Sequence, residues 1–129
     1  MNKIYIETSV GELIDKITIL EIKKNKISDK DSLIEINKEH EALKESMKKN
    51  VKITNEIKDL WDNLRITNLK LWEVEDQKRL CEKNKTFDKN FIELARNVYR
   101  LNDERAKIKL KINNLSGSNI KEIKQYTEY

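Results

Sequence analysis

The residues of this sequence best suited to chemistry are polar and aromatic side chains on two otherwise apolar helix faces. At about 100° per residue, the apolar positions between residues 54 and 83 share one face, and those between 87 and 115 share another. The residues that stand out on these faces are Asn68, Trp72, Glu75, Arg79, Asn102 and Arg105, here called the polar seam. Because a buried polar group is costly without a partner, these side chains should meet other side chains, water or a ligand.

Two interpretations of the polar seam stay open. In the first, its side chains form hydrogen bonds and ion pairs that fix the register and oligomeric state of packed helices. In the second, Arg79, Arg105 and Lys109 hold an anion in a cleft. Trp72 would then form one wall of that cleft, and Glu75 would act as its acid or base. The first interpretation is favoured because it is the best-attested use of such groups, so no residue is predicted to be catalytic.

Other candidate sites have weaker patterns. His40 lies on an apolar stripe between Ile36 and Leu43, which is typical of a packed histidine. No HExxH, CxxC or paired ExxH motif accompanies it, so neither a metal site nor a cofactor is predicted. The single cysteine, Cys81, excludes an internal disulfide and fits a reducing cytoplasm.

A locally basic segment extends from Arg105 to Lys111. The helical turn distributes its charges around the cylinder, and no aromatic residues alternate with them. Weak nucleic-acid binding is therefore the second alternative function.

Four helices are predicted to position these residues. Apolar residues recur with the helical period over about 10–27, 31–50, 54–83 and 87–115. The two long helices are joined by a short turn, so they should fold back on each other as an antiparallel hairpin. Each would be about 45 Å long at 1.5 Å per residue.

The hairpin also predicts which polar residues meet. If its turn centres on Lys85, residues whose numbers sum to about 170 lie opposite each other across the hairpin. Asn68 then faces Asn102, and Arg105 lies near Arg65.

The first helix and the residues before it indicate self-association. Ile19 and Ile22 lie with Asp15 opposite the main apolar stripe of this helix, so both of its sides should be packed. Residues 4–6 alternate apolar side chains and should form a short extended segment along a helix or against another subunit. A homo-oligomer, most simply a dimer, is therefore predicted.

Composition limits the fold and the compartment. A chain of 129 residues forms one domain, here 1–129, with an extended lead-in at 1–8 and a tail at 116–129. It has no proline and two glycines, which argues against a β-sandwich or barrel, and 39% charged residues, which can cover long helices. The net charge is +4. Neither a signal peptide nor an apolar run of membrane-spanning length is recognisable, so we expect a cytoplasmic protein.

Several segments resemble a family of short, functionally uncharacterised helical proteins of bacteria and phages, a domain of unknown function. The segments that carry the resemblance are the opening GELIDKITILEIK at 11–23, LWEVED at 71–76, FIELARNVY at 91–99 and LNDERA at 101–106. They span most of the chain. The resemblance implies a helical protein but no assigned activity.

A looser likeness concerns the first helix alone. Asp15, followed by Ile17, Leu20 and two lysines, looks similar to the first helix of the all-helical chorismate mutases. That likeness implies a small helical dimer that holds a dicarboxylate between arginines and lysines and needs no cofactor. The chain departs from the pattern, since it has no arginine in this helix and only five overall.

The sequence thus predicts an all-α, elongated helical bundle built on a long antiparallel hairpin, with coiled-coil-like packing. The favoured function is a non-enzymatic interaction or assembly protein that oligomerises through apolar helix faces and can also bind a protein partner. The alternative is a small cofactor-independent enzyme or anion-binding protein that uses the polar seam.

Overall fold

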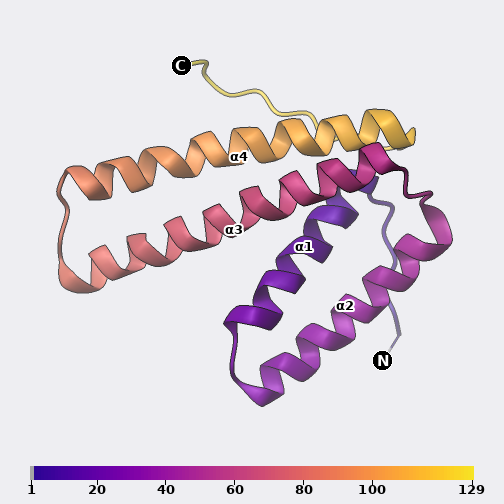
Figure 1. Cartoon of the computed structure of the whole chain (residues 1–129), viewed down its shortest axis with the longest axis horizontal. Coiled ribbons are helices and arrows are strands. Elements are labelled where there is room, and N and C mark those ends of the chain that lie inside the picture. The colour runs from indigo at the N-terminus through magenta and orange to yellow at the C-terminus, as the bar shows by residue number, and fades with distance from the viewer. Residues whose placement is uncertain (1) are drawn as a thin grey trace.

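The computed structural model describes residues 2–129, and over this range the chain is all-α without strands (Figure 1). Its four helices are α1 (Val10–Lys26), α2 (Lys30–Asn50), α3 (Asn55–Asn84) and α4 (Lys89–Ser116). The predicted all-α class is confirmed, and each predicted helix lies close to an observed one. With no proline in the chain, nothing interrupts the hydrogen-bond ladder of the two long helices.

Each helix begins at a short polar side chain that accepts a hydrogen bond from a backbone N–H three residues later. These caps are Ser9, Asp29, Thr54 and Asp88. α3 ends at Lys85 (φ 54°) and α4 at Gly117 (φ 66°), both in the left-handed conformation that commonly stops a helix. The helix limits are therefore set by local chemistry.

α3 and α4 lie side by side and form a long arm, whereas α1 and α2 diverge from it so that the molecule resembles a V (Figure 1). α1 packs against all three other helices, and within residues 2–129 α2 packs only against α1. The core lies where α1 crosses the arm, and its most buried side chains are Ile14, Ile17, Ile57, Leu64 and Ile112. α1 is therefore the central helix, and it covers only the part of the arm farthest from the loop joining α3 and α4.

The ends of the chain cross near the junction of α1 and α4. Ile4, Tyr5 and Ile6 are 90%, 84% and 83% exposed, so this extended segment does not pack along a helix of its own chain. Its predicted pairing with another subunit stays a prediction. The tail after α4 is held by a hydrogen bond from Asn119 to Glu7 (2.6 Å), and no helix forms within it.

Gly11 allows α1 to approach α4 closely. Its backbone N–H donates to the Asn113 side-chain oxygen at 2.7 Å. A Cβ at this position would lie 2.6 Å from the carbonyl oxygen of Lys109 and 2.9 Å from the Asn113 oxygen. Because the nearer atom belongs to backbone, a larger residue would have to push the two helices apart.

Gly11→Ala is therefore expected to lower the free energy of unfolding by about 1–3 kcal/mol, the usual cost of overpacking. Urea denaturation followed by circular dichroism measures it. Gly117→Asn is the control, because asparagine tolerates the left-handed conformation and no atom lies within 4 Å of the new Cβ. Equal stability of Gly11→Ala and the native chain would show that the close approach is not needed.

Candidate functional site

All six residues of the polar seam line one pocket between α1 and the arm. The pocket has a volume of about 530 Å³, and its remaining lining residues are Ile19, Ile22, Leu71 and Asp76. The predicted residues come together because successive turns of α3 and α4 present them on the side of the arm toward α1. Proximity alone does not assign them a ligand.

The pocket has an apolar floor and a charged rim. Ile22 and Leu71 are buried, and Trp72 is half-buried beside them. At the rim, Arg79 donates to the Glu75 carboxylate at 3.0 Å, and its own side chain is 75% exposed. The pocket therefore combines an apolar surface with an ion pair that faces solvent.

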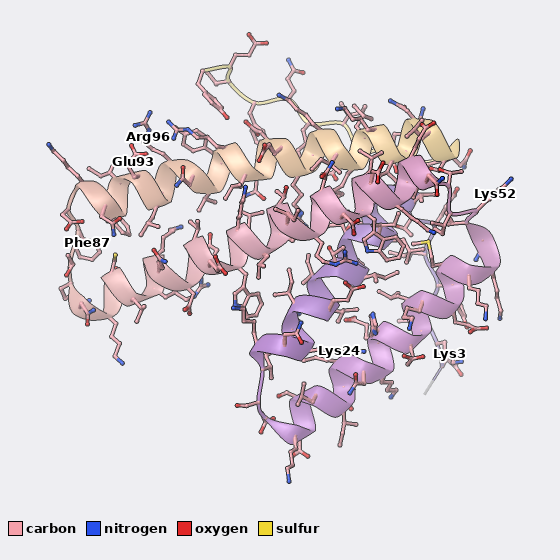
Figure 2. The ribbon with its side chains drawn as sticks, in the orientation of Figure 1. Lys3, Lys24, Lys52, Phe87, Glu93 and Arg96 are labelled. Atoms are coloured by element: carbon pink, nitrogen blue, oxygen red, sulfur yellow. The ribbon has the colours of Figure 1, made fainter. Side chains whose placement is uncertain are left out.

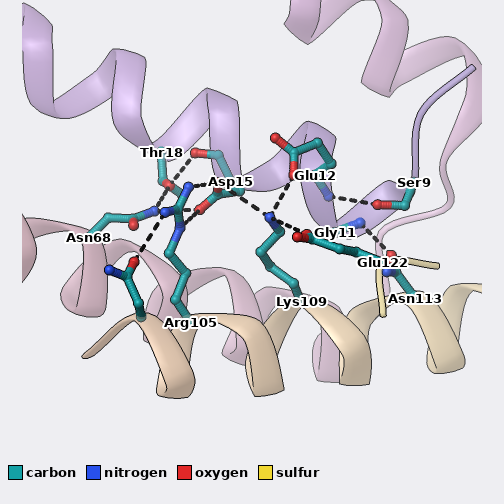
Figure 3. A network of polar contacts seen from close by, with 11 residues as sticks. Ser9, Gly11, Glu12, Asp15, Thr18, Asn68, Arg105, Lys109, Asn113 and Glu122 are labelled. Carbon is teal, nitrogen blue, oxygen red and sulfur yellow. Dashed lines mark hydrogen bonds and ion pairs between the residues drawn. The ribbon is translucent and has the colours of Figure 1, made fainter. Parts of the chain in front are cut away.

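Beside the pocket, three helices meet at one buried carboxylate, that of Asp15 on α1 (Figure 3). Nε of Arg105 donates to Asp15 Oδ1 at 2.8 Å, and a second guanidinium nitrogen donates to Oδ2. Asn68 Nδ2 donates to the same Oδ1 at 2.8 Å, and also to the Thr18 hydroxyl at 2.8 Å. Asp15 thus accepts hydrogen bonds from two residues of the polar seam, Asn68 and Arg105.

The hydrogen bonds of Asn68 and Arg105 reach a helix that the hairpin register does not include. Asn68 and Asn102 line the same pocket, but Asn68 and Arg105 both donate to Asp15. The reason is that α1 lies on this side of the arm and brings a carboxylate into it. The only sign of this contact in the sequence was Asp15, an acidic residue on the second apolar side of α1 with Ile19 and Ile22.

A second ion pair lies one turn along α4. Lys109, which is buried, places Nζ 2.5 Å from Glu12 Oε2 and 3.8 Å from Asp15 Oδ2. Glu122 of the tail lies 3.4 Å from the same nitrogen. Ser9 accepts from the Glu12 N–H at 3.1 Å, but the Glu12 carboxylate bonds Lys109, so only half of a capping box forms.

The environment of Asp15 keeps it ionised. Burial by itself raises the pKa of this carboxyl, but hydrogen bonds from Arg105 and Asn68 and the charges of Arg105 and Lys109 outweigh burial. The pKa of Asp15 therefore lies below its ordinary 3.8. The hydrogen bond to Asp15 raises the pKa of Arg105, so both partners are charged at neutral pH.

Asp15→Asn should lower the free energy of unfolding by about 3 kcal/mol, because it leaves the Arg105 charge partly buried without its counter-ion. Chemical denaturation at neutral pH measures the change. Asp62→Asn is the matched control, since Asp62 pairs with Arg65 at the surface and its loss should cost less than about 1 kcal/mol. Equal effects of the two variants would contradict the structural role of Asp15.

The lowered pKa of Asp15 also predicts how the free energy of unfolding depends on pH. Because the folded state lowers the pKa of Asp15, the stabilisation is complete above pH 3.8 and is lost as the pH falls through the folded-state pKa. The stability difference between the native chain and Asp15→Asn should therefore be constant from pH 7 to about 5 and shrink in stronger acid. Denaturation curves across this range test it, and a difference that grows in acid would contradict the assignment.

Both arginines of the pocket are already paired, Arg79 with Glu75 and Arg105 with Asp15. Lys109, the third cation of the predicted anion cleft, does not line the pocket and is paired with Glu12. The locally basic segment of α4 likewise turns Arg105 and Lys109 inward, so it does not present a continuous basic surface. An anion in the pocket would therefore meet arginines whose charges are already neutralised by carboxylates of the same chain.

His40 lies outside the pocket, between α2 and α1. Lys24 Nζ lies 2.6 Å from its Nδ1, and since an ammonium can only donate, Nδ1 is the acceptor and the ring is neutral. Burial, and then the charges of Lys24 and Lys44, lower the pKa of His40. Its Nε2 is buried without a hydrogen-bond partner among residues 2–129. This is a packed histidine with an unfavourable charged form.

Because the folded state lowers the pKa of His40, the stabilisation it provides is complete above pH 6.5 and is lost as the pH falls through the folded-state pKa. His40 is the only histidine, so a fall in stability below pH 6.5 reports on it. Thermal denaturation from pH 7.5 to about 5 should show this fall in the native chain and not in His40→Gln. An identical pH dependence of the two proteins would contradict the assignment.

The remaining predictions concern the cysteine, metal sites and membrane spans. Cys81 is a free, half-buried thiol outside the pocket. Across residues 2–129, no three histidine, cysteine or acidic side chains gather in a way that could hold a metal ion. None of the helices formed by these residues is long and apolar enough to cross a membrane.

Comparison with known proteins assigns the chain to a family. A family model described as "Family of unknown function (DUF6165)" matches residues 4–128, so the chain belongs to this family. No curated protein and no solved structure matches the chain. The resemblance to a functionally uncharacterised family is confirmed, and membership assigns no ligand to the pocket.

Proposed function

We propose that this member of a family of unknown function is a non-enzymatic helical assembly protein that oligomerises through its arm. The observation that carries the proposal is an uncovered side of the arm. We call this side the inner face and define it by Trp72, Glu75 and Arg79 of α3 and by Phe91, Ala95, Val98 and Asn102 of α4. It is the side of the arm that faces α1.

The inner face continues the surface of the arm that α1 covers farther from the tip. Arg105 and Lys109 point from α4 to α1, and the helical period places Val98 and Ala95 on the same side of α4, nearer the tip. Over residues 2–129, only α3 and α4 make up this outer part of the arm. Two helices alone leave their common apolar face half open, and a third or fourth helix usually closes it.

The opposite side of the arm is charged. Glu93 and Arg96 point away from α1 (Figure 2), and Arg96 donates to Glu93 at 2.7 Å. Arg100 lies 3.6 Å from the same carboxylate. An arm surrounded by water would be polar on both sides, so the four apolar residues of the inner face, Trp72, Phe91, Ala95 and Val98, favour a protein contact there.

An aromatic residue at the margin of the inner face is also exposed. Phe87 is 53% exposed, and its ring packs on Phe91. It therefore widens the apolar surface available to a partner. Aromatic residues of this kind commonly anchor protein interfaces.

The alternative function, a small enzyme or anion-binding protein, would use the same pocket. All six polar-seam residues line it, which favours this alternative. Against it, Arg79 and Arg105 are each neutralised by a carboxylate of the same chain. A partner helix with apolar side chains and a few charges does not need an unpaired cation in order to bind. The pocket therefore suits a helical partner better than an anionic ligand.

The proposal predicts a dimer in solution at tens of micromolar, with twice the 15.4 kDa mass of the chain. Ala95→Glu should give a folded monomer, because it adds an unpaired charge to the centre of the inner face. Gln77→Glu is the matched control, since it adds the same charge to an exposed position of α3 away from that face. Size-exclusion chromatography with light scattering gives the masses. A monomeric native chain, or a dimeric Ala95→Glu, would contradict the proposal.

A further inference from the structure

We infer that two copies pack their inner faces antiparallel, so that the tip of each arm closes the pocket of the other copy. The inference rests on the proposed function and adds the occupant of the pocket and its orientation. The tip is the loop after α3 together with Phe87. The pocket would then be completed by residues of the second copy.

The order of charges along α3 favours an antiparallel arrangement. Glu75 and Asp76 lie nearer the pocket, and Arg79 and Lys83 lie nearer the tip. A two-fold axis close to Lys78 places the acidic pair of each copy near the basic pair of the other. A parallel arrangement would place like charges together, which is unfavourable in a partly buried interface.

Arg79 is free to take part in such a contact. Its side chain is 75% exposed although it donates to Glu75, so its other guanidinium nitrogens face solvent. An arginine can bond two carboxylates at once because it has five donors. The intramolecular pair therefore does not compete with the intermolecular one.

The apolar parts of the two copies match as well. Phe87 lies at the outermost end of the arm (Figure 2) and is 53% exposed, and its ring packs edge-to-face on Phe91 with centroids 5.1 Å apart. Because the chain reverses after Asn84, Phe87 lies level with about residue 83 of α3, and the same axis brings it level with about residue 73 of the other copy. There Trp72 lines the pocket together with Ile19 and Ile22. An aromatic tip thus meets an apolar pocket that its own chain leaves open.

The size of the contact indicates a weak dimer. The antiparallel overlap covers about 13 residues of each α3, or about 20 Å. Two helices side by side are about 20 Å wide, so about 400 Å² would be buried on each copy. The total of roughly 800 Å² is below the usual size of a stable interface and fits a dimer that forms at tens of micromolar. Ala95 and Val98 are small and permit close approach along this length.

Charge reversal tests the orientation and separates it from the proposed function. Glu75→Lys/Asp76→Lys makes the four positions 75, 76, 79 and 83 all basic, and Arg79→Glu/Lys83→Glu makes the same four positions all acidic. We expect each variant alone to dissociate with a dissociation constant raised more than about tenfold. An equimolar mixture should restore the dimer as a heterodimer. Glu93→Lys/Glu104→Lys, on the opposite side of α4, is the matched control and should dimerise like the native chain.

Cross-linking tests the position of the tip. In a Cys81→Ser background, Ile19→Cys/Phe87→Cys treated with a short thiol cross-linker should form a covalent dimer that joins positions 19 and 87, as identified by peptide mass. Phe87→Cys alone should remain uncross-linked. Circular dichroism confirms that each variant folds.

The results distinguish failure of the proposed function from failure of the antiparallel arrangement. A monomeric native chain removes the proposed function and this inference together. A dimer that survives both charge reversals, or one cross-linked between two copies of Phe87→Cys, leaves the assembly function intact but overturns the antiparallel arrangement.

Discussion

The buried carboxylate of Asp15 is the constraint on which the arrangement of the helices depends. A fully buried charge is tolerated only where several donors surround it, and Arg105 and Asn68 bring those donors from α4 and α3. The three helices are thereby fixed at one point with one relative orientation. Gly11 and Asn113 set the distance between α1 and α4 at the next contact. α1 consequently ends partway along the arm and leaves its outer part bare.

The proposed function depends on which side chains this contact engages and which surface it leaves exposed. Arg105 and Lys109 are engaged inside the molecule, so the pocket beside them has little capacity to attract an anion. What the pocket does offer is apolar surface from Ile22, Leu71 and Trp72, continued by the inner face of the arm. A surface of this kind suits a helix better than a small charged ligand. Recognition by packing is therefore the central feature of our account.

The sequence predicted the helices well because their signals are local. Ser9 and Asp29 start helices by capping, and the absence of proline leaves α3 and α4 unbroken. The six residues of the polar seam line one pocket, since residues on one helix face stay together whatever covers them. The sequence did not predict the partners of Asn68 and Arg105, because helical periodicity defines a face but not which helix covers it. That choice is made by the long-range approach of α1, of which Asp15 was the only local sign.

The central claim, that the inner face is the contact surface, is tested most directly by isotope-filtered nuclear Overhauser measurements on a mixture of labelled and unlabelled chains. These detect only protons of different copies that lie close together. Our account predicts intermolecular signals at the methyl groups of Ala95 and Val98 and between Phe87 and the methyl groups of Ile19 or Ile22. Intermolecular signals confined to the opposite side of the arm, around Glu93 and Arg96, would contradict it.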